Sequence, residues 1–248
     1  PMPATPAWPP KSAPRLFVDG ALSIGETRRI GGNAAHYLAQ VMRAKPGDAV
    51  ILCDNISGEW AARVSDASKR HVDLELVERL RVREDVPDVW LCIAPVKKPH
   101  FDLILEKATE LGVGTIQPVL TRRCVVDKVN MDRARIITTE AAEQCARTAL
   151  PEIQPLTPLT QLLKNWPADR LLYFADELGG TPALQAFTEA ASSRAEAQMP
   201  AALLIGPEGG FDDAERAAIR AHPCARPISL GPRILRAETA AIVALALW

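Results

Sequence analysis

Two short segments near the end of the chain constrain the fold more than any other part of the sequence. In each, an apolar run leads directly into a loop of glycine and proline, and a helical pattern follows. The first segment is Leu203–Phe211 and the second is Leu230–Ala240. Apolar runs of this length are typical of strands buried in a parallel sheet, and such strands end at a common edge. We therefore expect both loops to lie side by side at the carboxyl edge of one sheet.

Open α/β folds bind ligands at this edge, so the two loops form the predicted binding site. Glycine lets backbone groups approach a ligand closely, and proline restricts the loop before binding. An ordinary strand-to-helix turn is the alternative explanation for either loop alone. Neither phosphate motif, GxxxxGK[ST] or GxGxxG, is present, which disfavours a nucleotide phosphate. The expected binding residues are Leu204, Ile205, Gly206, Pro207, Glu208, Gly209, Gly210, Leu230, Gly231, Ile234, Leu235, Ala237, Thr239 and Ala240.

The pattern along the chain divides it into three parts. Residues 1–14 are rich in proline and alanine, lack the pattern of a signal peptide and are expected to be a disordered leader. Residues 15–84 contain short alternating runs typical of a small β domain. Residues 85–248 alternate apolar runs with helical patterns, which predicts a parallel sheet covered by helices on both faces.

Composition excludes several classes of protein. Lys and Arg number 29 against 30 Asp and Glu, which rules out a polycationic nucleic-acid coat but not a local basic patch. The five cysteines are widely spaced without a CxxC pair, and the four histidines show no metal-ligand spacing. The sequence therefore predicts no disulfide framework and no metal site. This cysteine usage fits a reducing cytoplasm, so we expect a cytoplasmic protein. No apolar run reaches membrane-spanning length.

Local signals predict several helix boundaries. Asn33 is the expected N-cap of a helix ending at Arg43, and Asn130 that of a helix reaching Thr148. Asp212 with Glu215 predicts a capping box. The last helix, expected over Thr239–Leu247, is apolar on nearly every side and must be buried. Such a surface predicts a homodimer.

The two loops and three further motifs resemble the SPOUT methyltransferases, and in particular the ribosomal RNA small subunit methyltransferase E family. The further motifs are Glu106–Val113, Glu140–Arg147, and His36–Arg43 with its following Lys45–Asp48 turn. Five motifs in the family's order span roughly residues 15 to 248. The resemblance implies an α/β domain with a trefoil knot, a PUA-like N-terminal β domain and a homodimer. It also implies S-adenosylmethionine (SAM) as cofactor and N3 of a uridine in 16S ribosomal RNA as the methylated atom.

Charged residues near the loops are the candidates for catalysis and RNA binding. Arg236, Glu238 and Arg123 are the predicted catalytic residues. Arg236 and Arg123 would supply positive charge, and Glu238 would complement the cofactor. The simpler interpretation of Glu238 is a carboxylate that stabilises the start of its helix through the helix dipole. The simpler interpretation of Arg236 is an arginine exposed to solvent on a loop. The predicted RNA-binding residues are Arg15, Arg43, Lys45, Lys97, Arg122 and Arg147.

Two other functions compete with this interpretation. One is a SPOUT ribose 2′-O-methyltransferase, which the sequence Lys107–Gly112 disfavours because it replaces the start typical of those enzymes. The other is a ribosome-associated RNA-binding protein without catalytic activity, which would not need intact cofactor loops. Binding of SAM by the purified protein separates the second alternative from an enzyme.

Overall fold

The computed structural model describes residues 8–193, 196 and 199–248, so half of the predicted leader, residues 1–7, lies outside the described residues. The chain forms two compact units. The first contains residues 1–85 together with 142–150, and the second contains residues 86–141 and 151–248. The chain thus returns once to the first unit after entering the second.

The first unit is built on a five-stranded sheet in the order β1-β3-β4-β5-β2. Its strands are β1 (Arg15–Phe17), β2 (Thr27–Gly31), β3 (Ala49–Cys53), β4 (Gly58–Ala67) and β5 (His71–Val82). Strands β3 and β4 pair antiparallel as a hairpin, which agrees with the small β domain predicted for this part of the chain. The small core contains Leu38, Val50, Leu52 and Leu74.

The predicted Asn33 cap is wrong. Helix α1 (Gly32–His36) begins after Gly31, which makes no side-chain cap hydrogen bond, and a π-helical turn, η1 (Tyr37–Val41), continues it. Gly32 has φ +59°, a conformation that glycine adopts without strain. The glycine pair therefore sets the start of this helix instead of the asparagine.

The second unit contains the predicted parallel sheet, in the order β11-β13-β10-β12-β6-β7-β8. Neighbouring strands all pair parallel, and apolar runs supply the central ones. The strands are β6 (Val89–Ile93), β7 (Thr115–Leu120), β8 (Glu152–Ile153), β10 (Leu171–Ala175), β11 (Thr181–Pro182), β12 (Ala201–Ile205) and β13 (Ala225–Ser229), and β9 (Thr157–Pro158) pairs with β7.

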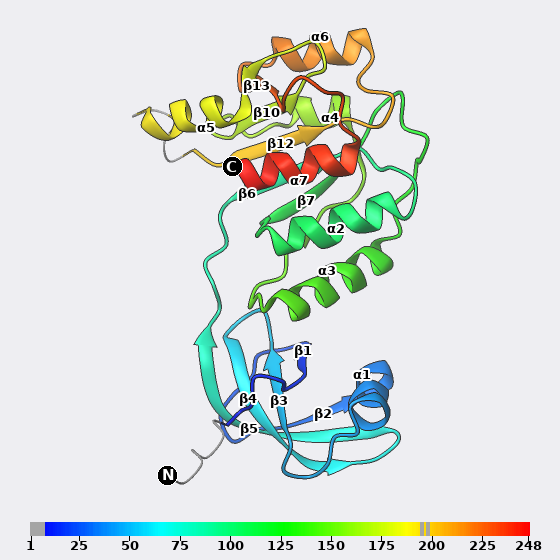
Figure 1. Cartoon of the computed structure of the whole chain (residues 1–248), viewed down its shortest axis with the longest axis vertical. Helices are drawn as coiled ribbons and strands as arrows, with labels where there is room; N and C mark the ends of the chain where they lie inside the picture. The colour runs from blue at the N-terminus through cyan, green and yellow to red at the C-terminus, as the bar shows by residue number, and fades with distance from the viewer. Residues whose placement is uncertain (1–7, 194–195, 197–198) are drawn as a thin grey trace. The chain divides into compact units, whose positions relative to one another are not determined.

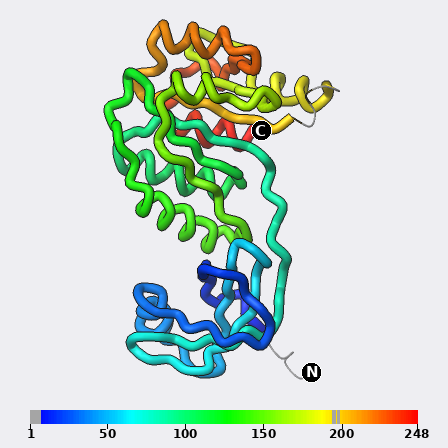
Figure 2. The backbone as a smooth tube through the Cα atoms, turned by 180° about the vertical axis from the view of Figure 1, so that it is seen from behind, coloured from blue at the N-terminus to red at the C-terminus, as the bar shows by residue number. Residues whose placement is uncertain are grey.

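Helices cover both faces of this sheet, as predicted. One core includes α2 (His100–Glu110), α3 (Met131–Cys145), α5 (Ala183–Ser192) and α7 (Ala237–Leu247), and Figure 1 shows α7 beside α2. The other includes α4 (Leu159–Lys164) and α6 (Asp213–Ala221). Seen from behind in Figure 2, α7 lies beyond the strands. None of the described helices is long and apolar enough to cross a membrane.

Two predicted caps are confirmed in the second unit. The Arg133 backbone N–H donates to Asn130 Oδ1 over 2.9 Å at the start of α3. Asp212 and Glu215 form the complete capping box of α6. Helix α3 ends at Cys145, three residues before the predicted end, and Ala146 has φ +62°. These caps fix where α3 and α6 begin relative to the loops that precede them.

Candidate functional site

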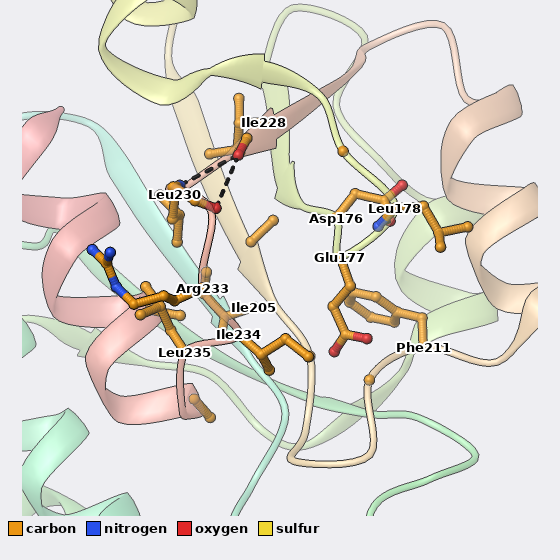
Figure 3. Close-up of a pocket in the computed structure, with 18 of the residues that line it drawn as sticks. Asp176, Glu177, Leu178, Ile205, Phe211, Ile228, Leu230, Arg233, Ile234 and Leu235 are labelled. Atoms are coloured by element: carbon orange, nitrogen blue, oxygen red, sulfur yellow. Dashed lines mark hydrogen bonds between the residues drawn. The ribbon is translucent and has the colours of Figure 1, made fainter.

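A cavity of about 310 Å³ lies at the carboxyl edge of the parallel sheet. Three neighbouring strands, β13, β10 and β12, end there, and the loop after each contributes to its walls. The start of α7 closes it through Ala237 and Ala240. In Figure 3, Glu177 and Phe211 lie on one side, and Ile234 and Leu235 on the other. The cavity is large enough for a small cofactor, since such sites hold roughly 300–1,000 Å³.

The loop after β12 is shaped by its glycines. Gly210 has φ +66°, and its backbone N–H donates to Pro207 O over 2.8 Å to close a tight turn. A Cβ at Gly210 would lie 2.8 Å from Glu177 Oε1, and a Cβ at Gly206 would lie 3.2 Å from the Phe211 ring. These positions accept no side chain without movement, so the cavity wall here is bare backbone.

The loop after β10 is held by a buried ion-pair cluster. Asp176 has a fully buried carboxylate that accepts from Arg216 Nε over 3.1 Å and from Arg220 Nη2 over 2.6 Å. Arg220 Nη2 also donates to Gly179 O over 3.0 Å, and the Leu178 N–H donates to Asp176 Oδ1 over 3.0 Å. These contacts position the Glu177 carboxylate against Gly210 in the cavity.

The cavity suits SAM in its size and its chemistry. Its apolar side chains, including Ile205, Phe211 and Leu235, can enclose an adenine ring. The bare backbone at Gly206 and Gly210 leaves room for close approach. Glu177 and Glu208 supply carboxylates, which complement a positively charged sulfonium or amino group. The residues present therefore fit this cofactor.

Most of the predicted binding residues meet in this cavity. Its walls include Ile205, Gly206, Pro207, Glu208, Gly210, Leu230, Gly231, Ile234, Leu235, Ala237 and Ala240. Leu204, Gly209 and Thr239 do not line it. Successive side chains of β12 point to opposite faces of the sheet, so Leu204 points into the core that contains α4 and α6. Gly209 packs against Arg123, whose Cβ would lie 3.3 Å from an added Cβ.

None of the three predicted catalytic residues lines the cavity. Arg236 is exposed at the N-cap of α7 and makes no cap hydrogen bond. Glu238, in the first turn of α7, has Oε1 2.9 Å from His100 Nδ1 on α2. Arg123 Nη1 donates to Gly209 O over 2.9 Å, so Arg123 braces the loop from outside.

The predicted RNA-binding residues have different environments. Arg43 and Lys45 are exposed in the first unit, and Arg15 there pairs with Glu59. The exposed Arg122 forms a 3.0 Å ion pair with Asp212, and Lys97 is exposed on the second unit.

Arg147 departs from the expected RNA contact because it is only 6% exposed. Burial lowers the pKa of its guanidinium, and its Nε lies 4.0 Å from Glu84 Oε1. Glu84 Oε1 also accepts from the Thr148 N–H over 2.6 Å. An arginine held this way stabilises the first unit instead of presenting its charge to a phosphate.

The loop after β10 also belongs to the site, although none of its residues was among the predicted binding residues. Residues 175–179 line the cavity, as do Phe211, Arg216, Ile228, Ser229, Pro232 and Arg233. A signal was present, because Leu171–Ala175 is an apolar run followed by Gly179 and Gly180. The same strand-and-glycine pattern marks this segment as a candidate loop, but its place at the site follows from the strand order of the folded sheet.

Comparison with known proteins identifies the family. A family model described as the RNA methyltransferase domain matches residues 83–248, and an RNA methyltransferase PUA domain model matches residues 30–77. The ribosomal RNA small subunit methyltransferase E of Rickettsia conorii is 32% identical, covering 94% of this chain and 93% of the relative. The chain belongs to the ribosomal RNA small subunit methyltransferase E family.

Further members of the methyltransferase E family agree. The Synechocystis sp. member is 35% identical, with 94% of this chain and 76% of the relative covered. The Neisseria gonorrhoeae member, solved bound to S-adenosyl methionine, has a TM-score of 0.81 and 25% identity, covering 94% and 95% of the two chains. A Legionella pneumophila methyltransferase with bound cofactor SAM has a TM-score of 0.82 and 29% identity, covering 95% and 96%.

Membership of the methyltransferase E family confirms the predicted fold class. The SPOUT-type parallel sheet and the PUA-like N-terminal β domain are both present. The trefoil knot stays a prediction from the resemblance. SAM is the cofactor of this family of enzymes.

Proposed function

We propose that this chain is a SAM-dependent methyltransferase acting on small-subunit ribosomal RNA. The observation that carries the proposal is the cavity walled by three strand-end loops, in a chain of the methyltransferase E family. A non-catalytic RNA-binding protein would have no use for such a cavity. Isothermal titration calorimetry tests the first step: the purified protein should bind SAM at one site per chain, and failure to bind would refute it.

The cofactor is held by the two predicted loops together with the loop after β10. Gly206, Gly210 and Gly231 offer backbone, and Glu177 and Glu208 offer carboxylates that favour a positively charged ligand. When bound, SAM supplies an activated methyl group on a positively charged sulfur. The Asp176 cluster keeps Glu177 in place, so little rearrangement is needed on binding.

The proposed target atom is N3 of a uridine in 16S ribosomal RNA. This assignment rests on the resemblance to the family and on the names of the relatives. Neutral N3–H is a poor nucleophile, so an enzyme must accept its proton and stabilise negative charge on the uracil oxygens. N3 lies on the Watson–Crick edge, which requires an unpaired or flipped base.

Residues at the start of α7 and at the start of α2 are suited to these tasks. Arg236 is exposed and beside the cavity residue Ala237, so it supplies positive charge at the rim. His100 Nδ1 faces the Glu238 carboxylate at 2.9 Å, which leaves Nε2 as the nitrogen able to accept a proton. In this proposal His100 takes the N3 proton, Glu238 orients His100, and Arg123 braces the cofactor loop.

The first unit would hold the RNA. Arg43 and Lys45 are exposed on the PUA-like domain, where they are free to approach phosphates. Contacts to phosphate position a substrate and add salt-dependent affinity without reading its sequence. Small-subunit ribosomal RNA is a cytoplasmic substrate, which agrees with the location expected from the sequence.

The active enzyme would be a homodimer formed through α7. Five residues of this helix are buried in its own chain, namely Ala237, Ala240, Ala241, Ala244 and Leu245. Its remaining face is still apolar, because Ile242 and Val243 are half-buried and Leu247 is 38% exposed. Trp248 is 43% exposed and Ile234, at the cavity, is 87% exposed. A second copy would cover these exposed apolar side chains.

A further inference from the structure

A second cavity, of about 220 Å³, lies in the second unit between the starts of α2 and α3. Its walls come from the segment after β6, from α2 and from the loop that leads into α3. Strand β6 pairs parallel with β12, so this cavity opens at the same carboxyl edge as the cofactor cavity. An RNA strand that brings its target base to the cofactor cavity can therefore continue along the same edge to the second cavity.

The inner surface of this cavity is apolar. The residues that share this property are Val96, Phe101, Leu105, Val126, Val129 and Ala134. Four of these side chains are buried in the main core, which fixes their positions: Val96, Phe101, Leu105 and Ala134. The other two, Val126 and Val129, are half-buried. At about 220 Å³ the cavity is below the roughly 300–1,000 Å³ of sites that hold whole small ligands. A single flat ring is a better match for its size.

The rim carries an excess of positive charge. Lys97, Lys98, Lys128 and Arg133 border the cavity, against the single carboxylate of Asp102. Arg133 is tied to Asp102, with Nη2 2.6 Å from Oδ2. Lys97, Lys98 and Lys128 are all exposed, and within the part of the chain that the structure describes they form no ion pair. Three uncompensated ammonium groups around an apolar hollow complement a ring that carries phosphates.

We propose that this cavity binds a second nucleotide of the substrate RNA, with its base on the apolar floor and its phosphates against Lys98 and Lys128. The inference rests on the proposed function, because the occupant belongs to the same RNA as the methylated uridine. The enclosed floor admits a base only when it is unstacked, so the cavity selects single-stranded RNA. It would fix the strand beside the target and so help to hold the target base out of a helix.

The experiment compares binding of a short single-stranded RNA and of the same sequence as a duplex, by filter binding across a salt series. Lys98→Glu and Lys128→Glu should each weaken binding of the single strand and lower its salt slope by about 0.7 to 1. Lys164→Glu is the matched control, since Lys164 is an exposed lysine at the end of α4. That helix is followed by Trp166, which packs against Trp90 near the start of β6, at the opposite edge of the sheet.

A charge-neutral variant separates the base from the phosphates. Val129→Phe fills the cavity, and should reduce the preference for single-stranded over duplex RNA while leaving the salt slope unchanged. The lysine variants overturn the proposal if they bind RNA as Lys164→Glu does. A single-strand preference in a folded Val129→Phe variant equal to that of the wild type would also overturn it.

Failure of the inference is distinguishable from failure of the proposed function. Calorimetry with SAM and methylation of small-subunit RNA at saturating concentration are measured for every protein. If the wild type binds SAM and methylates RNA but the variants bind RNA normally, only the second nucleotide site is wrong. If the wild type does neither, the proposed function itself fails.

Discussion

At the scale of single residues, the cofactor site depends on positions that have no side chain. Gly210 combines φ +66° with a Glu177 oxygen 2.8 Å from where its Cβ would stand. Gly210→Ala should therefore displace Glu177 or open the turn. We expect calorimetry to show SAM binding weakened tenfold or more, about 1.4 kcal/mol. Unchanged affinity in a folded variant would remove Glu177 and this turn from the site.

His100 is the residue that most directly tests the proposed proton transfer. His100→Gln keeps a hydrogen-bond donor for Glu238 but cannot accept the N3 proton. General-base catalysis contributes roughly 100- to 10,000-fold, so methylation at saturating substrates should fall on the order of 100-fold. SAM affinity should stay within twofold, because His100 does not line the cofactor cavity. A full methylation rate in the folded variant would exclude His100 as the acceptor.

At the scale of elements, the turn between β3 and β4 is organised by one carboxylate. Asp54 Oδ1 accepts from the Ile56 and Ser57 N–H groups over 2.9 and 2.7 Å, and Oδ2 accepts from the Leu22 N–H over 2.8 Å. Burial alone would raise the pKa of Asp54, but the Ser57 hydroxyl and these N–H groups outweigh it and lower the pKa to about 2. The charged form therefore stabilises the first unit.

Asp54→Asn should reduce the free energy of unfolding by about 2 kcal/mol at neutral pH. Because the folded pKa lies below the unfolded value of about 3.9, this stabilisation is present above about pH 4. It is lost as the pH falls toward 2. Urea denaturation across a pH series should show the difference between wild type and variant shrinking over that range. A constant difference would mean that the carboxylate charge is not what stabilises the turn.

Elements with strong local signals were predictable from the sequence. The capping box at Asp212 and the apolar run of β12 led to the correct elements, because their information is local. The environments of Arg147 and Leu204 were not predictable. Burial of Arg147 depends on its packing near Glu84, and the inward turn of Leu204 depends on which face α4 and α6 cover. Such partners lie far away in the sequence, so no local pattern reports them.

At the scale of the whole molecule, the position of the site at the sheet edge was predicted, but not all of the residues that line it. Two of its three loops follow apolar runs ending in Gly and Pro, a pattern visible without a structure. The loop after β10 is part of the site because β10 lies between β12 and β13 in the sheet. Only the folded sheet defines this order. The second cavity depends on the packing of α2 and α3, and Lys97 was its only residue among the predicted RNA-binding positions.

The apolar surface of α7 gives a prediction about assembly. If a second copy covers Ile242, Val243 and Leu247, light scattering at micromolar concentration should give twice the chain mass of 26.9 kDa. Val243→Glu should weaken the dimer, because it places a charge in an apolar interface. A monomeric wild type with full activity would contradict the proposed dimer.

Mapping of modified nucleosides in ribosomal RNA tests the central claim most directly. Small-subunit RNA is compared by mass spectrometry between a strain with the chain, a strain without it and a strain in which it is restored. We predict that one N3-methyluridine disappears when the chain is removed and returns when it is restored, but not when Gly210→Ala is supplied at limiting cofactor. Persistence of N3-methyluridine without the chain, or loss of a ribose methyl group in its place, would contradict the account.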